Sequence, residues 1–348
     1  MLTRLRVKGF KNLHDVDLYL DRFTCVAGPN GVGKSNLFDA IALLGALSAK
    51  PVIEALLSVR GTNGRMSEIG RLFSAGGESP ATIEFVADMI LPRLVRDDFD
   101  REAPPTATFV EYTLKIGFDP TRPGGDKDPV YIEHEVLKAK SSSDAMRSLP
   151  FHPDSSWVKA HIVGPGSRTT PFVDTYFQTD GTPTIKLYGE RTQKGGRPSS
   201  VPAHKSPQTV VCGVNAVTHP TALAARNEMR SWRMLQLEPS ALRRPDELHG
   251  NPRVSAMGEH LPSALVRIGG HAEIARRLAD LIPGALAVHV ETDVVRQTRA
   301  LKVQLRDRET YSASSLSDGT LRFLALAIMV QDPEFAGLVC MEEPENGI

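Results

Sequence analysis

Four residues near the start of the chain have the types and spacing of a phosphate-binding loop. Gly28, Gly33, Lys34 and Ser35 follow the pattern G-x-x-x-x-G-K-[ST]. Glycine adopts backbone conformations closed to other residues, so the loop's N–H groups can turn toward phosphate oxygens at the positive end of the following helix. The lysine would reach the β- and γ-phosphates, and the serine hydroxyl would ligate Mg²⁺. The alternative is a flexible glycine loop in front of a helix.

The residues around this loop favour phosphate binding. Residues 23–27 (FTCVA) form a short apolar run that predicts a strand, and residues 35–47 carry apolar side chains at helical spacing. Strand, loop and helix in this order is the context in which the pattern cradles phosphate. The sequence therefore predicts a nucleotide site here.

A second group of chemically informative residues lies near the end of the chain. Residues 316–320 (LSDGT) open a predicted helix, where Ser317 can act as N-cap and Gly319 allows close backbone approach. Glu342 and Glu343 end the apolar run 337–343. Beside a phosphate loop, one such carboxylate can hold Mg²⁺ and the next can polarise the attacking water. The alternative, a capped helix plus an acidic loop, is disfavoured by the order of the three motifs.

Together, "GPNGVGKSN", "LSDGTLRFLAL" and "CMEEPENGI" resemble the ABC-type ATPase heads of the RecF, SMC and OLD (overcoming lysogenization defect) group. The chain looks most like bacterial AAA-type ATPases whose Walker B strand ends in E-E-P-E-N-G. The resemblance covers residues 1–48 and about 225–348 well, and the middle only in layout. It implies an α/β P-loop NTPase fold: an ABC-type head with an antiparallel β subdomain and a mixed α/β insertion.

The resemblance also implies roles for individual residues. Glu343 would be the catalytic base, acting with Lys34, while Ser35 and Glu342 would hold Mg²⁺. The signature motif would meet the γ-phosphate of ATP held by a second copy, so ATP would be sandwiched in a two-fold homodimer. Nucleotide binding would fall to residues of Walker A and the signature motif: Gly28, Asn30, Gly31, Gly33, Lys34, Ser35, Asn36, Ser317 and Gly319.

Three departures from the family pattern qualify this assignment. Asp318 replaces a signature glycine and adds negative charge near phosphate. No glutamine precedes Gln178, so the usual Q-loop residue has no evident counterpart. The chain stops at Ile348, before the D-loop and switch histidine of the family. We therefore expect a piece of a longer protein, with the C-terminal part of the ATPase core missing and inefficient hydrolysis by this piece.

The predicted function is an ATP-binding and ATP-hydrolysing head that drives DNA repair or anti-phage defence, with DNA and a nuclease or effector as further partners. The DNA link rests on analogy alone. One alternative is a non-hydrolysing, nucleotide-dependent switch or scaffold for an effector. A transporter subunit is disfavoured, because about 280 residues separate the motifs and the residues between them alternate like strands.

Composition sets limits on location and partners. The 348 residues include 41 basic and 41 acidic side chains, so no whole-molecule charge favours nucleic acid. The charged N-terminus is neither a signal peptide nor an anchor, and no apolar run reaches the roughly 20 residues of a membrane span. Cys25, Cys212 and Cys340 lack metal-ligand spacing, and the first and last lie in predicted core strands. A cytoplasmic protein without a membrane partner is expected.

Three regions are predicted: an N-terminal lobe with Walker A (1–78), a β-rich insertion or lid with a polar basic loop (79–220), and a helical C-terminal lobe with the signature motif and Walker B (221–348). Strands are expected at both ends of residues 2–20 and in runs at 81–91, 109–119, 130–139, 285–295 and 300–307, and helices at 219–235 and 261–284. The Pro-, Gly- and Ser-rich composition of residues 150–215 favours a loop or lid insertion. A nucleic-acid-contacting arm is the alternative, because basic residues cluster there with few acids: Lys186, Arg191, Lys194, Arg197 and Lys205.

Overall fold

The computed structural model describes residues 1–74, 81–121, 128–190, 199–282, 284–306, 309–335 and 337–343. These residues fall into two compact units, Met1–Trp232 and Arg233–Ile348, each with its own buried core. Strands of the first two predicted regions join in one sheet of the first unit. The division into three regions stays a prediction.

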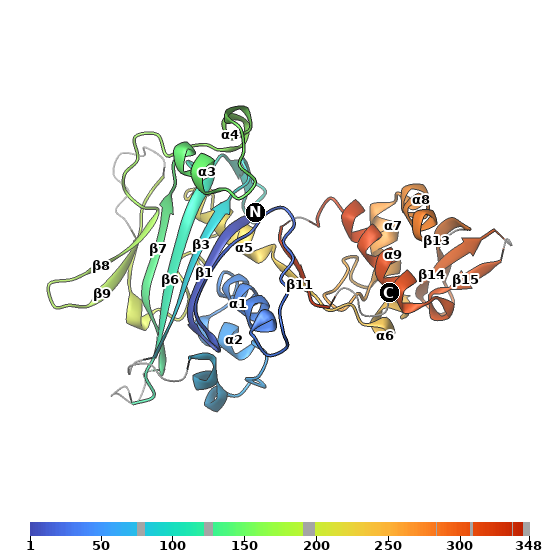
Figure 1. Ribbon diagram of the computed structural model, residues 1–348, viewed down its shortest axis with the longest axis horizontal. Helices are drawn as coiled ribbons and strands as arrows, with labels where there is room; N and C mark the ends of the chain where they lie inside the picture. The colour runs from blue at the N-terminus through green and yellow to red at the C-terminus, as the bar shows by residue number, and fades with distance from the viewer. Residues whose placement is uncertain are drawn as a thin grey trace. The chain divides into compact units, whose positions relative to one another are not determined.

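A large antiparallel sheet organises the first unit (Figure 1). Within the described residues it has eight strands in the order β10-β9-β8-β7-β6-β3-β1-β2. Its strands are β1 (Leu2–Phe10), β2 (Leu13–Tyr19), β3 (Ala81–Ile90), β6 (Phe109–Phe118), β7 (Val130–Ala139), β8 (Val173–Phe177), β9 (Pro183–Leu187) and β10 (Ser199–Pro202). The short β4 (Val95–Arg96) and β5 (Glu102–Ala103) pair with each other. The antiparallel sheet predicted from alternating residues is confirmed.

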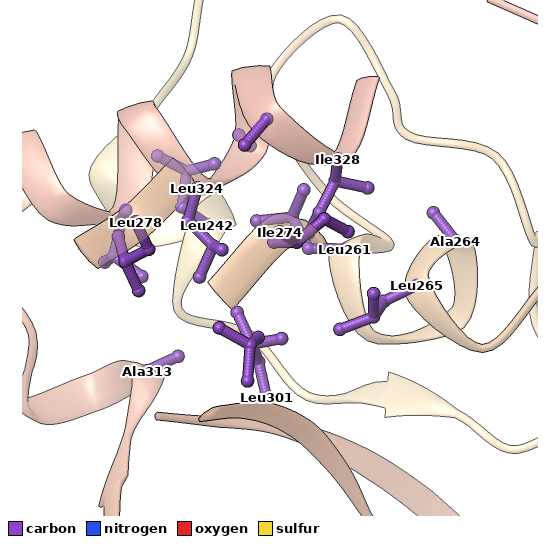
Figure 2. Close-up of a cluster of buried hydrophobic side chains, with 14 of the residues drawn as sticks. Leu242, Leu261, Ala264, Leu265, Ile274, Leu278, Leu301, Ala313, Leu324 and Ile328 are labelled. Carbon is purple, nitrogen blue, oxygen red and sulfur yellow. The ribbon is translucent and has the colours of Figure 1, made fainter. Parts of the chain in front are cut away.

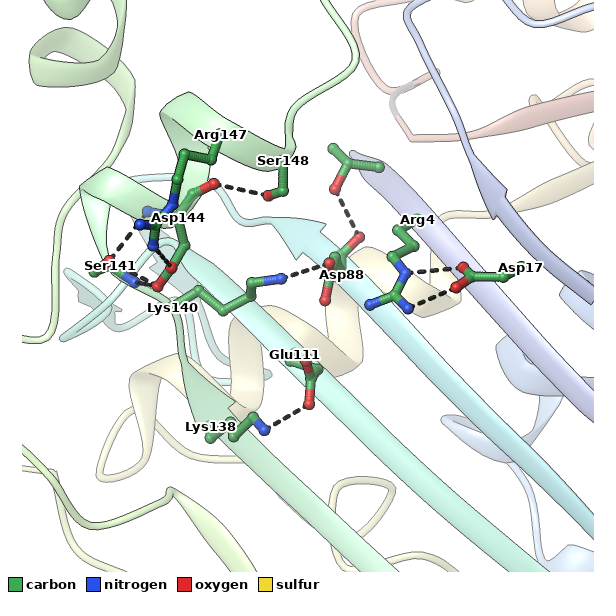
Figure 3. A network of polar contacts seen from close by, with 11 residues as sticks. Arg4, Asp17, Asp88, Glu111, Lys138, Lys140, Ser141, Asp144, Arg147 and Ser148 are labelled. Carbon is green, nitrogen blue, oxygen red and sulfur yellow. Dashed lines mark hydrogen bonds and ion pairs between the residues drawn. The ribbon is translucent and has the colours of Figure 1, made fainter. Parts of the chain in front are cut away.

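The two faces of this sheet differ in polarity, as alternation requires. Leu5, Phe85 and Leu114 are fully buried on the inner face. On the outer face, Figure 3 shows Arg4 paired with Asp17 and Lys138 paired with Glu111 across neighbouring strands. Lys140 also reaches the buried Asp88 at 2.6 Å, although burial still raises the pKa of that carboxyl. The outer face is therefore held by cross-strand ion pairs.

Helices cover the inner face of the sheet. Figure 1 shows α1 (Lys34–Leu47) and α2 (Val52–Leu57) on one side of it, and α1 contacts both β1 and α5 (Pro220–Arg230). The buried residues Leu37, Ile41 and Leu44 lie at helical spacing along α1, which confirms the predicted helix. The remaining helices of this unit are α3 (Ser142–Ser148), α4 (Ser155–His161) and the 3-10 turns η1 (Met66–Leu72) and η2 (Ala203–Lys205).

The strand predicted at residues 23–27 is wrong. The segment is not in a strand, Phe23 is 86% exposed, and Cys25 is exposed rather than buried in a core strand. A β-favouring run becomes a strand only where a neighbour supplies ladder hydrogen bonds. Among the described residues this segment has no pairing strand.

The second unit packs helices on a small sheet. Its strands are β12 (Asp246–Glu247), β13 (Ala285–Asp293), β14 (Thr298–Leu305) and β15 (Thr310–Ser312), while β11 (Arg233–Leu235) and β16 (Val339–Met341) pair in parallel. Its helices are α6 (Pro239–Leu242), α7 (Leu261–Ile268), α8 (His271–Leu281), α9 (Asp318–Gln331) and the 3-10 turn η3 (Ala313–Ser315). Figure 2 shows Leu242, Leu265, Ile274, Leu324 and Ile328 meeting in the core between them.

One helix predicted for residues 261–284 is instead two. Gly269 (φ 71°) and Gly270 (φ 69°) separate α7 from α8 in backbone conformations that side chains rarely adopt. The break turns both apolar faces into the same core, where Leu265 and Ile274 are fully buried.

The predicted lid contains more regular structure than its composition indicated, because β8, β9 and β10 extend the large sheet. Of its basic cluster, Lys186 lies on β9 with its ammonium 3.8 Å from the Tyr176 ring centre, and Lys205 lies on η2. Arg191, Lys194 and Arg197 lie outside the described residues. In the part of the chain that is described, no helix has the length and apolar character needed to cross a membrane.

Candidate nucleotide-binding site

The phosphate loop enters α1 through two glycines with left-handed backbone. Gly31 has φ 80° and Gly33, at the N-cap of α1, has φ 113°. A Cβ at Gly33 would lie 2.8 Å from the side-chain oxygen of Asn12, so a larger residue would collide there, whereas Gly31 has open space around it. No side chain caps α1 and its first turn has no acidic residue, so backbone N–H groups face the loop.

The predicted binding side chains gather at this end of α1. The Nζ of Lys34 donates to the carbonyl oxygens of Gly28 (2.5 Å) and Pro29 (2.8 Å), which holds the ammonium over the loop. Ser35 is exposed in the first turn, and Asn30 is exposed in the loop. Asn36 donates from Nδ2 to the Oδ1 of Asn12 at 2.8 Å. The structure therefore brings the Walker A residues together, while their roles stay predictions.

Side chains that the motif did not predict surround the loop. The buried carboxylate of Asp39 accepts from Lys11 Nζ (2.7 Å) and Arg60 Nε (2.8 Å), and Arg60 Nη2 donates to the Ser35 carbonyl oxygen at 3.1 Å. Asn12 Nδ2 also donates to the Gly31 carbonyl oxygen at 3.4 Å. The one signal in the sequence was Asp39, a charged residue on the apolar face of the predicted helix.

The signature motif forms the start of α9 in the second unit. The Oγ of Ser317 accepts from the Thr320 N–H at 3.2 Å, which confirms the predicted N-cap, and Gly319 lies in the first turn. Asp318 is paired with Arg243, whose Nη2 lies 2.6 Å from Oδ1 of Asp318 and 2.9 Å from the Leu316 carbonyl oxygen. The added negative charge that Asp318 brings is thus balanced within the same unit. The buried Nε of Arg322, one turn further along, has no hydrogen-bond partner among the described residues.

The predicted Walker B acids follow β16. Cys340 is buried in this strand as predicted, and burial raises the pKa of its thiol to about 12, so it is inert. Glu342 is half-buried directly after the strand, and Glu343 is exposed with φ 46°. A non-glycine residue at positive φ is uncommon, and such strain collects at functional sites. Residues 344–348 of the motif lie outside the described residues.

The two Mg²⁺ ligands predicted from the sequence lie in different units, Ser35 in the first and Glu342 in the second. Within the described residues, no group of three or more His, Cys, Asp or Glu side chains could hold a metal by itself. The exposed Ser35 hydroxyl and the half-buried Glu342 carboxylate are the hard oxygen ligands that Mg²⁺ takes alongside phosphate oxygens. Each residue therefore offers a ligand type that Mg²⁺ accepts, and their joint role stays a prediction.

Most of the chain matches a family known from sequence. Residues 23–104 and 219–348 match the family described as "AAA domain, putative AbiEii toxin, Type IV TA system". The match includes the phosphate loop, the signature motif and the paired glutamates.

One relative and three solved structures are also similar to this chain. An OLD nuclease of Thermus scotoductus is 50% identical over 44 residues, which are 13% of this chain and only 8% of that protein. An Smc head bound to the C-winged helix domain of ScpA aligns with 99% of this chain and 77% of its own (16% identity, TM-score 0.42). An Smc head with an extended coiled coil from Pyrococcus furiosus aligns with 100% of this chain and 83% of its own (12% identity, TM-score 0.44). The SMC head of Thermotoga maritima aligns with 100% of this chain and 79% of its own (13% identity, TM-score 0.36).

The three TM-scores lie below 0.5, so the assignment rests on the family match, which covers more than half of the chain. It confirms the resemblance predicted from the three motifs. The chain belongs to this family of AAA domains, and the match supports a nucleotide-binding ATPase head.

Proposed function

We propose that this chain is an ATP-binding and ATP-hydrolysing head that closes into a two-fold dimer around ATP. The observation that carries the proposal is the Lys34 ammonium, held 2.5 Å and 2.8 Å from two loop carbonyl oxygens in front of the uncapped α1. A triphosphate can replace these carbonyls as the partner of the ammonium, while the N–H groups of the first turn donate to the same phosphates.

The chemistry at the terminal phosphate then falls to the acids after β16. Bound Mg²⁺ supplies charge neutralisation and polarises the phosphoryl group. Ser35 and Glu342 would hold the ion, and Glu343 would take a proton from the attacking water.

The second half of the site comes from another copy of the chain. Ser317 and Gly319 start α9, whose N-terminal N–H groups suit an anion, and Arg243 offsets the Asp318 carboxylate beside them. ATP bound to one copy would thus meet the signature motif of the other, and hydrolysis would require the dimer.

The family and the relative support a proposal for the biological output. The family description names a type IV toxin–antitoxin system, and the relative is named a nuclease. We therefore propose that ATP-driven closure of this head controls a nuclease or effector in defence against phage or in DNA repair.

The test combines mass with turnover. Light scattering with and without ATP and Mg²⁺, alongside phosphate release, is applied to the wild type, Lys34→Ala and Glu343→Gln. Lys50→Ala, near the opposite end of α1, is the matched control because the Lys50 side chain pairs with Glu54 on the surface. We expect Lys34→Ala to abolish ATP binding, Glu343→Gln to accumulate an ATP-bound dimer without phosphate release, and Lys50→Ala to behave as wild type.

Two results would contradict the proposal in different ways. ATP binding and dimerisation with no turnover in the wild type, unchanged by Glu343→Gln, would establish a nucleotide-dependent switch instead of an enzyme. No ATP binding by the wild type would remove the nucleotide site altogether.

A further inference from the structure

The hairpin turn between β1 and β2 lies against the phosphate loop. The strands pair as far as Phe10 and Leu13, so Lys11 and Asn12 make the whole turn. Lys11 has φ 50°, a strained conformation for a residue with a side chain, and its N–H donates to the Leu72 carbonyl oxygen at 2.7 Å. Strain of this kind persists where the surroundings fix the conformation, and the contacts of both side chains explain why it is kept.

Asn12 contacts the loop on both sides of Lys34. Its Nδ2 donates to the Gly31 carbonyl oxygen at 3.4 Å, and its Oδ1 accepts from Asn36 Nδ2 at 2.8 Å. The same side chain lies where a Cβ at Gly33 would collide, at 2.8 Å from Oδ1. One amide group therefore touches the loop before the lysine and the helix after it.

Lys11 fastens the helix by a second route. Its ammonium bonds the buried Asp39 of α1 at 2.7 Å and the Arg60 carbonyl oxygen at 2.9 Å. Arg60 bonds Asp39 in turn and donates to the Ser35 carbonyl oxygen. Because Asp39 is buried, its charge needs both cations, and loss of either would disturb the first turn of α1.

We propose that Lys11 and Asn12 are positioning residues for the phosphate loop, with Asn12 setting the geometry of the loop and Lys11 that of α1. The inference rests on the proposed nucleotide site and extends it. The turn joins β1 to the edge strand β2 of the large sheet, so the sheet and the phosphate cradle are joined through two adjacent side chains. Asn12 acts on a triphosphate through Gly31, Gly33 and Asn36, and loosening it costs affinity for the phosphates.

The experiment is a double-substitution cycle on ATP affinity, measured by calorimetry with ATP and Mg²⁺. We expect Asn12→Ala to weaken ATP binding roughly tenfold, and Asn36→Ala to a similar degree, as for the loss of a hydrogen bond that orients the loop. The double variant should bind no more weakly than the worse single variant, because both remove the same contact. His14→Ala, an exposed residue two positions further along, is the matched control and should leave affinity unchanged.

A second variant separates positioning from folding. Asn12→Asp keeps the size of the side chain and the acceptor for Asn36, but it loses the donor to Gly31 and places a charge beside the cradle. We expect it to keep the wild-type unfolding midpoint within a few degrees and to bind ATP more weakly than Asn12→Ala. Wild-type affinity in either Asn12 variant, or multiplicative effects in the cycle, would overturn the inference. Failure of the wild type to bind ATP would instead refute the nucleotide site itself.

Discussion

Asp318 places a carboxylate where the signature motif of the family has glycine. Arg243, in the same unit, forms an ion pair with it. The guanidinium spans the Asp318 side chain and the Leu316 carbonyl oxygen, one residue on either side of the N-cap Ser317. The two side chains are 28% and 45% exposed, so solvent screens the pair and it adds little to folding stability. Its effect is local: it keeps the signature motif neutral where an anion is expected.

The pair can be tested by substituting each partner. Arg243→Ala should leave an uncompensated carboxylate beside Ser317 and weaken the ATP-dependent dimer several-fold, on the order of 1 kcal/mol per site. Removing that carboxylate as well, in Arg243→Ala with Asp318→Asn, should restore dimerisation close to the wild type. Arg253→Ala is the control, because Arg253 forms an exposed pair with Glu334 elsewhere in this unit. Dimer dissociation constants from light scattering decide the matter. An unrestored double variant would show that Arg243 acts by its own contact.

Some of these residues could be predicted from the sequence and others could not. The difference lies in how far apart in the sequence the contacting residues are. Gly31, Lys34 and Ser317 belong to short motifs whose geometry is set by near neighbours. The bond from Lys11 to Asp39 spans 28 residues and that from Arg243 to Asp318 spans 75, so both depend on the tertiary fold. A local pattern carries no information about such partners.

Among the elements, local propensity predicted most helices and strands where the residues also find a packing partner. The helix at α1 and the strands β3, β6 and β7 carry clear periodicities, and each packs or pairs along its length. Residues 23–27 have the same β-favouring composition without a pairing strand among the described residues. The prediction of one helix over 261–284 was wrong because two glycines interrupt a pattern of apolar residues that is otherwise continuous.

The break between α7 and α8 makes a prediction about stability. Gly269 has φ 71° and ψ −143°, a region essentially reserved for glycine. Gly269→Ala should therefore lower the free energy of unfolding by about 1–3 kcal/mol. Gly189→Ala is the control, because Gly189 lacks a positive φ and a Cβ there would meet open space, so that variant should be neutral or slightly more stable. Urea unfolding of both variants gives the comparison. A Gly269→Ala protein as stable as wild type would mean that the residue does not need this backbone conformation.

At the scale of the whole molecule, each unit has its own core, and the first is tied together by a buried carboxylate. Glu135 of β7 is fully buried and accepts from the N–H groups of Val210 (2.7 Å) and Val211 (2.9 Å) and from the Tyr112 hydroxyl (3.1 Å). The adjoining Thr209 hydroxyl donates to the Leu47 carbonyl oxygen at the end of α1. The segment that follows η2 is thus fastened to the sheet on one side and to the Walker A helix on the other.

This carboxylate makes the stability of the first unit depend on pH. Burial raises the pKa of Glu135 from 4.5 to about 7, against the lowering effect of its hydrogen bonds. Between these values the folded chain holds a proton that the unfolded chain has lost. The stabilising contribution of Glu135 to the free energy of unfolding is therefore complete below pH 4.5. It is lost, by about 3 kcal/mol, as the pH rises toward 7.

Glu135→Gln has no charge to bury, so its free energy of unfolding should fall less over this range, although one N–H of the carboxamide must face a backbone donor. Glu133→Gln is the control, since Glu133 lies on the same strand in a half-exposed pair with Lys115 and should follow the wild type. Urea unfolding at intervals from pH 4.5 to 7.5 tests this directly, and parallel curves for Glu135→Gln and wild type would show that Glu135 does not titrate in the fold.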